Sequence, residues 1–433
     1  MGSLLPPRRM ASAGIAGVLA AVFFFFALAA HAQVPTFTFK GQGTALTRLS
    51  LILQPGQGVT RPAMLEAAQA VQRALLSSGF FTVNILPPGQ SVSGNWNEGQ
   101  VTFPVVLAVE QAGAAERLVS VEVMDGGVGR PNFRQQFQIT GGGFRDIGFA
   151  AADVVYKHFL NREGYFTARI LYVREANDRG RKAFQIVSSD LFGEGLQVHV
   201  SSRAELTSPN LSPDGSSLYY TAIQGDRPQI FRKTFQTGRE GPVFSDREIR
   251  FSLTVDAAGN LYYTKVVNGN SDIYRLAAGS RREQRLTTSG GIETEPSVSP
   301  DGSNIAYVSD SSGRQGVVVQ SLQTQSRRAA GTLPGRYGSP SWSPDSQSLA
   351  LTLQAGGNFG ITVQNQESGE ERQISSSFFE ENPAWAGNGK VILFERSARG
   401  GGSGTGLWLV DTETNHVFRL PIEGRPRDAR WLN

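Results

Sequence analysis

The sequence contains no cysteine among its 433 residues. This absence excludes disulfide bonds, Cys-ligated zinc, iron–sulfur clusters and thiol redox chemistry. Histidine is scarce, and His158, His199 and His416 stand apart from other ligand-type residues, which favours structural or surface roles. No run of Lys or Arg is longer than two, so no nucleic-acid partner is expected. The 50 glycines are about 12% of the 433 residues, above the usual share of roughly 7%. This excess indicates a β-rich fold with many tight turns.

The first 32 residues have the pattern of a cleavable secretory signal. Arg8 and Arg9 precede an uncharged stretch at 10–30, and Ala30 and Ala32 supply the small residues of a cleavage site. The uncharged stretch is almost long enough to span a bilayer, so an uncleaved anchor is the alternative interpretation. We expect cleavage near Gln33 and no stable membrane insertion.

A short motif recurs along the C-terminal two-thirds of the chain. Proline, then Asp or Asn, then Gly favours a hairpin turn. The copies are PNLSPDG (209–215), PSVSPDG (296–302), PSWSPDS (340–346) and PAWAGNG (383–389), with FSLTVDA (251–257) as a degenerate fifth. Spacings of 42, 45, 44 and 43 residues separate the predicted turn residues Asp214, Asp256, Asp301, Asp345 and Asn388.

Each repeat of about 43 residues contains enough strand-like segments for four strands. This is the size of one propeller blade. Three further strands at residues 168–200 lack an inner strand of their own. Residues 427–431 can supply it, because Trp431 occupies the position that Trp342 and Trp385 have in their repeats. The sequence therefore predicts an all-β, six-bladed β-propeller over residues 164–433, closed by the C-terminal strand.

Residues 33–163 show a different pattern and predict a small α/β domain. The leading peptide at 34–40 alternates apolar and polar residues, so it could pair with the sheet or stay available to a partner. Helices are expected at 62–77 and 144–160, and strands at 81–86, 101–109, 118–124 and 133–139.

Polar residues recur six positions before each turn residue, where the chain enters the inner strand of a blade. In a propeller these loops converge on one mouth of the central channel, so the sequence predicts a partner-binding mouth there. The alternative is that loop residues are polar in any case. The candidate residues are Ser208, Arg250, Glu295, Ser339 and Asn382, the matching Asp428, and the neighbours Thr294 and Glu381.

Enzymatic interpretations find little support in the sequence. Residues 400–406 resemble a G-x-S-x-G elbow superficially, but they lie between two strands with no helix after them. The aspartates Asp214, Asp301 and Asp345 could suggest a glycosidase, yet equivalent turns should lie a blade apart. We predict a binding protein with no enzymatic activity, no cofactor and no metal site.

Beyond the repeats, three segments are distinctive: TEPSVSPDG (294–302), AYVSDSSGR (306–314) and YFTARILYV (165–173). On these segments the chain resembles the TolB family of the Tol–Pal system in Gram-negative envelopes. The order of signal, small α/β domain, six-bladed propeller and closing strand is also that of the family.

The resemblance implies a monomeric periplasmic scaffold for outer-membrane integrity and cell division. Family members bind the lipoprotein Pal through the propeller mouth, here including Thr294 and Glu295, and bind TolA through the N-terminal peptide. Alternatives are a TolB-like propeller that binds a small ligand or glycan, or has weak hydrolase activity, and a purely structural envelope protein. The peptide residues expected to face a TolA-like partner are Gln33, Val34, Thr36, Phe37 and Phe39.

Overall fold

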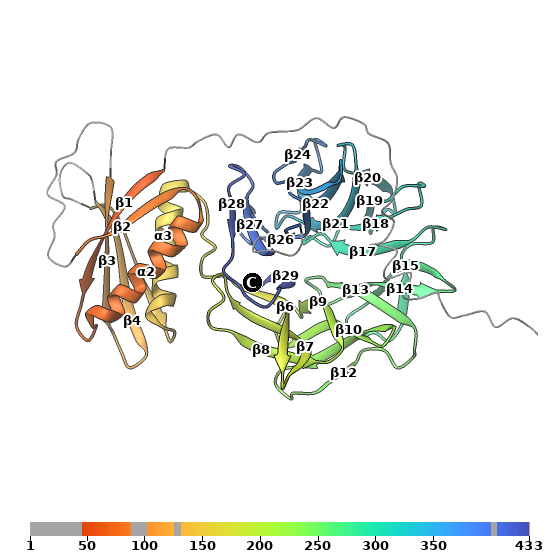
Figure 1. Ribbon diagram of the computed structural model, residues 1–433, viewed down its shortest axis with the longest axis horizontal. Coiled ribbons are helices and arrows are strands. Elements are labelled where there is room, and N and C mark those ends of the chain that lie inside the picture. The colour runs from red at the N-terminus through yellow and green to blue at the C-terminus, as the bar shows by residue number, and fades with distance from the viewer. Residues whose placement is uncertain (1–45, 88–101, 125–130, 400–404, 433) are drawn as a thin grey trace, which may run out of the picture.

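The computed structural model describes residues 46–87, 102–124, 131–399 and 405–432. Figure 1 shows a sheet with two helices on the left and a ring of sheets on the right. The predicted fold class, a six-bladed β-propeller preceded by a small α/β domain, is confirmed. The expected signal segment at 1–32 lies outside the described residues. Within the part described, no helix is long and apolar enough to cross a membrane.

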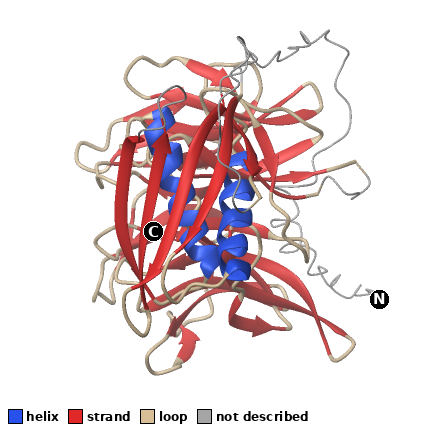
Figure 2. Cartoon of the chain, turned by 90° about the vertical axis from the view of Figure 1, so that its left-hand side faces the viewer, coloured by secondary structure: helices blue, strands red, loops and turns tan. Residues whose placement is uncertain are grey.

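The N-terminal α/β domain consists of β1 (Thr47–Pro55), α2 (Arg61–Ser77), β2 (Phe81–Ile85), β3 (Thr102–Gln111), β4 (Glu116–Met124), β5 (Pro131–Thr140) and α3 (Phe144–Leu160). Its sheet has the strand order β2-β1-β3-β4-β5, and both helices lie against the same face of it (Figure 2). β1 pairs in parallel with β2 and β3, whereas β3, β4 and β5 are antiparallel.

The core of this domain lies between the sheet and the two helices. Val119, Val121 and Val123 alternate along β4 and are fully buried, as expected for the covered face of a sheet. The helices approach each other most closely at Gly148 of α3. A Cβ atom there would lie 2.2 Å from the carbonyl oxygen of Ala67 in α2, so this crossing requires glycine.

The ring consists of six four-stranded antiparallel sheets. The first three blades comprise β6 (Arg169–Asp178), β7 (Arg181–Asp190) and β8 (Gln197–Ser202); β9 (Glu205–Leu211), β10 (Ser217–Gln224), β11 (Arg227–Thr234) and β12 (Glu240–Pro242); and β13 (Ile249–Val255), β14 (Leu261–Val267), β15 (Asn270–Leu276) and β16 (Glu283–Arg285). The others comprise β17 (Glu293–Val298), β18 (Asn304–Ser309), β19 (Gly316–Ser321) and β20 (Arg327–Ala330); β21 (Arg336–Trp342), β22 (Ser348–Ala355), β23 (Asn358–Asn365) and β24 (Glu371–Gln373); and β25 (Phe379–Trp385), β26 (Val391–Ser397), β27 (Gly406–Asp411) and β28 (Val417–Arg419).

The last strand, β29 (Arg427–Leu432), joins the first blade, whose strand order is β29-β6-β7-β8. Trp431 stands opposite Ile170 of β6 in this pairing. The same contact recurs at three of the boundaries between blades. The indole N–H groups of Trp342, Trp385 and Trp431 each donate to an inner-strand carbonyl of the preceding blade, at 3.0, 3.1 and 2.9 Å. The C-terminal strand thus takes the same place in the ring as the other inner strands.

The α/β domain and the ring share one continuous hydrophobic core. Phe149 of α3 stacks on Phe192 of the loop after β7, with ring centroids 5.2 Å apart. Arg162, just after α3, donates to Asp411 at the end of β27, with an Nη1–Oδ2 distance of 2.9 Å. Helix α3 is therefore attached to both the first and the last blade of the ring.

Candidate functional site

Each of the six inner strands carries a β-bulge at the same point of its repeat, where its register with the next strand shifts. One residue at each bulge is left-handed, with φ between 45° and 54°. None is glycine, so each such conformation costs roughly 1–2 kcal/mol at the Ser and Glu positions and less at Asn382 and Asp428. Backbone strain of this kind is a reason to look for function. These ring residues are Ser208, Ser252, Glu295, Ser339, Asn382 and Asp428.

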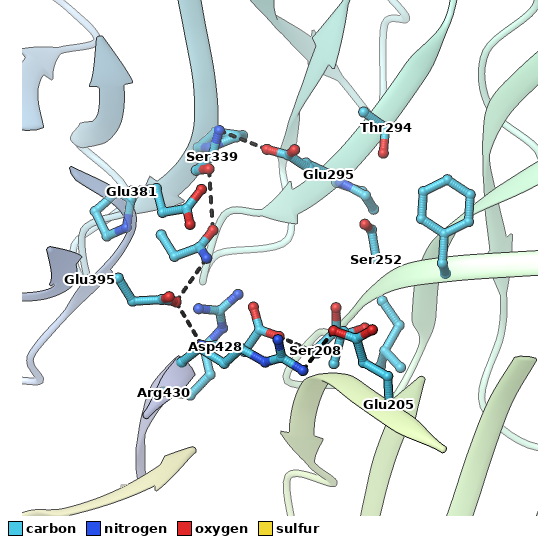
Figure 3. A pocket seen from close by; sticks show the side chains of 18 of the residues that line it. Glu205, Ser208, Ser252, Thr294, Glu295, Ser339, Glu381, Glu395, Asp428 and Arg430 are labelled. Atoms are coloured by element: carbon cyan, nitrogen blue, oxygen red, sulfur yellow. Dashed lines mark hydrogen bonds and ion pairs between the residues drawn. The ribbon is translucent and has the colours of Figure 1, made fainter. Parts of the chain in front are cut away.

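The ring residues surround a cavity of about 360 Å³, here called the mouth (Figure 3). Seven of the eight residues predicted for a partner-binding mouth line this cavity, and Arg250 does not. The seven are Ser208, Thr294, Glu295, Ser339, Glu381, Asn382 and Asp428.

Hydrogen bonds link neighbouring blades along one side of the mouth. The Ser339 amide donates to Glu295 Oε2 at 2.8 Å, and its hydroxyl lies 3.3 Å from Asn382 Oδ1. Asn382 Nδ2 donates to Glu395 Oε1 at 2.8 Å, and the Asp428 amide donates to the same oxygen at 2.6 Å (Figure 3). The bulge therefore turns backbone amides toward carboxylates of adjacent blades and holds this wall in place.

The remaining side of the mouth is less polar. Ile223, Phe251 and Leu253 contribute to its lining, next to the ring residue Ser252. Among the residues described, the Ser252 side chain makes no hydrogen bond. The cavity thus combines an apolar side with a side rich in carboxylates.

Carboxylates outnumber guanidinium groups in the mouth, and one of the two guanidinium groups is engaged locally. Arg427 Nη2 lies 2.7 Å from Glu205 Oε1, which leaves the other carboxylates with little compensating charge. The carboxylates are Glu205, Glu295, Glu381, Glu395 and Asp428, and the guanidinium groups are those of Arg427 and Arg430.

Burial dominates the electrostatics of these carboxylates. It raises the pKa of Glu295 and of Asp428 above their ordinary values. Burial and then the charge of Asp428 raise the pKa of Glu395 to about 7. Burial and then the charge of Glu395 raise the pKa of Glu381 well above its usual range. A desolvated carboxyl beside other carboxylates favours its neutral form.

A count of six residues back from Asp256 predicts Arg250 at the mouth, but this alignment of the repeat is wrong by two residues. The amide of Gly259 donates to the Asp256 carbonyl, as the amide of Gly215 donates to the Ser212 carbonyl. Asp256 is therefore equivalent to Ser212 at the start of the turn. The ring residue of this blade is accordingly Ser252.

The Arg250 side chain does not line the mouth; it is buried at the centre of an ion-pair cluster, with 1% of its surface exposed. Its Nε and Nη2 donate to the two carboxylate oxygens of Glu283 at 2.8 and 2.9 Å. Its Nη1 and Nη2 donate to Asp246 at 2.5 and 3.0 Å, and Nη2 donates to Glu248 at 3.2 Å. The guanidinium carbon lies 3.9 Å from the ring centroid of Phe244.

The same cluster contains the carboxylates that could share a metal ion in the described part of the chain, Asp246, Glu248 and Glu283. Arg250 already occupies the space between them, and Lys265 Nζ lies 2.8 Å from Glu283 Oε2. These two cations supply the charge that a metal ion would bring, so the residues do not fit a metal site.

The histidines and the repeated aspartates have structural surroundings. His158 stacks on Phe133 with centroids 4.2 Å apart, and His199 Nε2 lies 2.8 Å from Ser188 Oγ. The aspartates bind their own turns, as each accepts a serine hydroxyl at 2.5 Å and a backbone amide at 3.0 Å. This holds for Asp214, Asp301 and Asp345.

Sequence reasoning missed several residues of the mouth. Ser252 could have been found by aligning Gly259 with Gly215 and Gly302. Glu395 lies on the second strand of its blade, and no repeated motif marks that position. The ring residue and the charged residues that were missed are Ser252, Glu205, Glu395, Arg427 and Arg430, and the apolar residues Ile223, Phe251 and Leu253 were missed as well. The predicted partner peptide, with Gln33, Val34, Thr36, Phe37 and Phe39, lies outside the described residues.

The comparisons with known proteins agree with this architecture. The crystal structure of TolB from Acinetobacter baumannii superposes with a TM-score of 0.76 at 22% identity, covering 90% of this chain and 97% of that one. The Tol-Pal system protein TolB of Bordetella pertussis and that of Bordetella parapertussis are each 31% identical over 171 residues, 39% of this chain. This alignment spans 38% of the length of those relatives. A family model described as the TolB beta propeller domain matches residues 156–433, so the chain belongs to the TolB β-propeller family.

Proposed function

We propose that this protein is a periplasmic scaffold of the Tol–Pal system that binds other proteins and catalyses no reaction. The observation that carries the proposal is the mouth, where all six inner strands of a TolB-family propeller present a strained polar residue to one cavity. The name shared by the curated relatives, Tol-Pal system protein TolB, supports the choice of system.

The proposed partner at the mouth is a Pal-like, peptidoglycan-associated lipoprotein. A cavity with apolar residues beside fixed polar groups suits a protein loop or helix end better than a uniformly charged ligand. The residues proposed to face this partner are Ser208, Ser252, Thr294, Glu295, Ser339, Glu381, Asn382 and Asp428. Ser252 takes the place that the sequence pattern assigned to Arg250.

The N-terminal peptide at 33–40 is the proposed binding segment for a TolA-like inner-membrane protein. The two contacts would connect peptidoglycan, outer membrane and inner membrane, and so serve outer-membrane integrity and cell division. Export by the N-terminal signal would deliver the protein to the periplasm.

The decisive experiment measures binding of the purified soluble domain of the organism's own Pal-like lipoprotein by calorimetry. Ser252→Arg places a long cation into the mouth at a residue whose side chain makes no hydrogen bond in the described structure. Ser201→Arg, on the exposed outer strand β8, is the matched control. We expect wild type and Ser201→Arg to bind equally and Ser252→Arg to lose at least 30-fold in affinity, as expected for a blocked interface centre.

Equal binding by all three proteins would exclude the mouth as the interface, and no binding by wild type would exclude this partner. Removal of residues 33–40 tests the second contact separately. It should abolish binding of the periplasmic domain of a TolA-like protein and leave the lipoprotein affinity unchanged.

A further inference from the structure

Two glutamates face each other in the wall of the mouth. Glu381 of β25 and Glu395 of β26 are register partners in adjacent antiparallel strands, and both line the cavity (Figure 3). Directly opposed side chains have Cβ atoms about 4.5–5.5 Å apart, and like charges in this position destabilise a sheet. The pair therefore needs a neutralising charge or a proton.

The surrounding elements do not provide that neutralising charge. In the described chain no ion pair reaches Glu381 or Glu395. The neighbouring strand β27 places Leu407 opposite Glu395. Arg396 follows Glu395 in the sequence, but it forms an ion pair with Glu380, the residue before Glu381. β22 and β23 carry no charged residue.

Charged residues of three other strands also face the pair. β29 contributes Asp428, Arg427 and Arg430, of which Arg427 pairs with Glu205 of β9. β17 contributes Glu295, whose Oε2 accepts the Ser339 amide from β21. The groups around the pair thus include three more carboxylates, and the two guanidinium groups offset them only in part. The full set facing the pair is Glu205, Glu295, Arg427, Asp428 and Arg430.

The hydrogen bonds of the pair leave room for a proton. Glu395 Oε1 accepts from Asn382 Nδ2 at 2.8 Å and from the Asp428 amide at 2.6 Å, so this oxygen acts as an acceptor only. Glu381 accepts no hydrogen bond within the described residues. The raised pKa of both carboxyl groups, caused first by burial, agrees with one of them being neutral near pH 7.

We propose that Glu381 and Glu395 share one proton near neutral pH, and that the pair, where it has lost this proton at higher pH, takes it up again when a partner covers the mouth. The second part of this proposal, proton uptake on partner binding, rests on the proposed function. A partner that seats over the cavity removes the water that still solvates the pair. Burial of two adjacent carboxylates is costly without a cation, and protonation removes the cost. Binding is therefore linked to pH through this pair.

The direction and size of the linkage follow from proton counting. If the complex holds one more proton than the free protein, affinity falls by up to tenfold per pH unit above the pKa of the free pair. Below that pKa the pair already holds its proton, so affinity is flat. We expect the weakening between pH 7 and pH 9.

The first experiment needs no partner. Carboxyl carbons of labelled glutamate are followed by NMR from pH 4 to pH 9 in the full chain. Wild type should show a carboxyl group that titrates near pH 7. Glu381→Gln and Glu395→Gln should each remove this step, whereas Glu423→Gln, the same change at an exposed site, should keep it. Two variants are used so that a folding defect in one leaves the test valid.

The second experiment titrates the soluble domain of the Pal-like lipoprotein into the protein at pH 8 in two buffers of different ionisation enthalpy. The difference in heat reports proton uptake, expected to be close to one for wild type and Glu423→Gln and close to zero for Glu395→Gln. The affinity of Glu395→Gln should vary less than threefold from pH 7 to pH 9.

The outcomes separate the two proposals. A missing titration step near pH 7 overturns the shared proton even if the lipoprotein binds tightly. Tight binding with no proton uptake overturns the linkage alone. If the step is present but no lipoprotein binds at any pH, the proposed function fails and the shared proton stands.

Discussion

Replacement of Arg250 by alanine should destabilise the protein strongly without weakening binding at the mouth. The side chain is 1% exposed and donates to both oxygens of Glu283. Its other partners, Asp246 and Glu248, have side chains that are 48% and 46% exposed. Arg250 and these three carboxylates do not line the mouth, so the loss of the cluster concerns stability and not recognition.

The magnitude follows from how the partners are buried. Removal of one member of a buried ion pair costs about 3–5 kcal/mol. The exposed carboxylates add less than about 1 kcal/mol each. In the variant, Glu283 still accepts hydrogen bonds from the Tyr263 hydroxyl at 2.6 Å and from Lys265 Nζ at 2.8 Å. These two contacts limit the loss of stability. We therefore expect a loss of about 3 kcal/mol.

Urea unfolding of wild type and Arg250→Ala measures this loss, and calorimetry with the Pal-like lipoprotein measures binding. Arg203→Ala is the control, because Arg203 is half-exposed and pairs with Asp178 at the surface. It should change stability by less than about 1 kcal/mol. A loss below 1 kcal/mol for Arg250→Ala, or a fall in affinity like that of Ser252→Arg, would refute the reasoning.

Acid should reduce the difference in stability between wild type and Arg250→Ala. Arg250, Lys265 and Tyr263 outweigh the burial of Glu283 and lower its pKa from 4.5 to about 2. A carboxylate with a depressed pKa stabilises the fold above its unfolded pKa and loses that contribution as pH falls toward the folded value. The stability gap between wild type and Arg250→Ala should thus be constant above pH 5 and shrink between pH 4 and pH 2.

Three further substitutions test other parts of the fold. Gly148→Ala should destabilise by about 1–3 kcal/mol in thermal melts, because its Cβ would overlap α2, although alanine usually favours a helix over glycine by about 1 kcal/mol; a gain in stability would contradict the close crossing. Trp431→Ala should cost about 3 kcal/mol in urea, and a loss under 1 kcal/mol would mean that ring closure does not depend on this indole. The unfolding free energy of Glu395→Gln should rise relative to that of wild type by roughly 1–3 kcal/mol between pH 5 and pH 8. The reason is that the pKa of Glu395 is raised to about 7, so wild type loses stability as pH rises. A difference in stability that does not change with pH would argue against this raised pKa.

The repeat architecture could be predicted because each turn has strong local chemistry. Asp214, Asp301 and Asp345 bind the amides of their own turns, so the motif marks a hairpin regardless of its surroundings. The match of Trp431 with Trp342 and Trp385 also had a physical basis. All three indoles donate across a blade boundary, and this contact needs an inner strand in each case.

The position of Ser252 could not be read from the aspartate pattern. Asp256 accepts the amides of Ala258 and Asn260, so an aspartate at the first position of the turn closes it as well as one at the third. A count from the aspartate is then ambiguous by two residues. The role of Glu395 depends on strand register and on burial by other blades, and neither leaves a local pattern.

The pairing of β29 with β6 also has a consequence for the order of folding. Every other blade brings together strands that are neighbours along the chain, whereas this blade joins Trp431 to Ile170. A contact so distant in sequence forms slowly, because the intervening chain must first be ordered. Until that step β6 presents an unpaired edge, which is the surface most prone to mispairing. Chaperone binding and aggregation during refolding should therefore concentrate at β6.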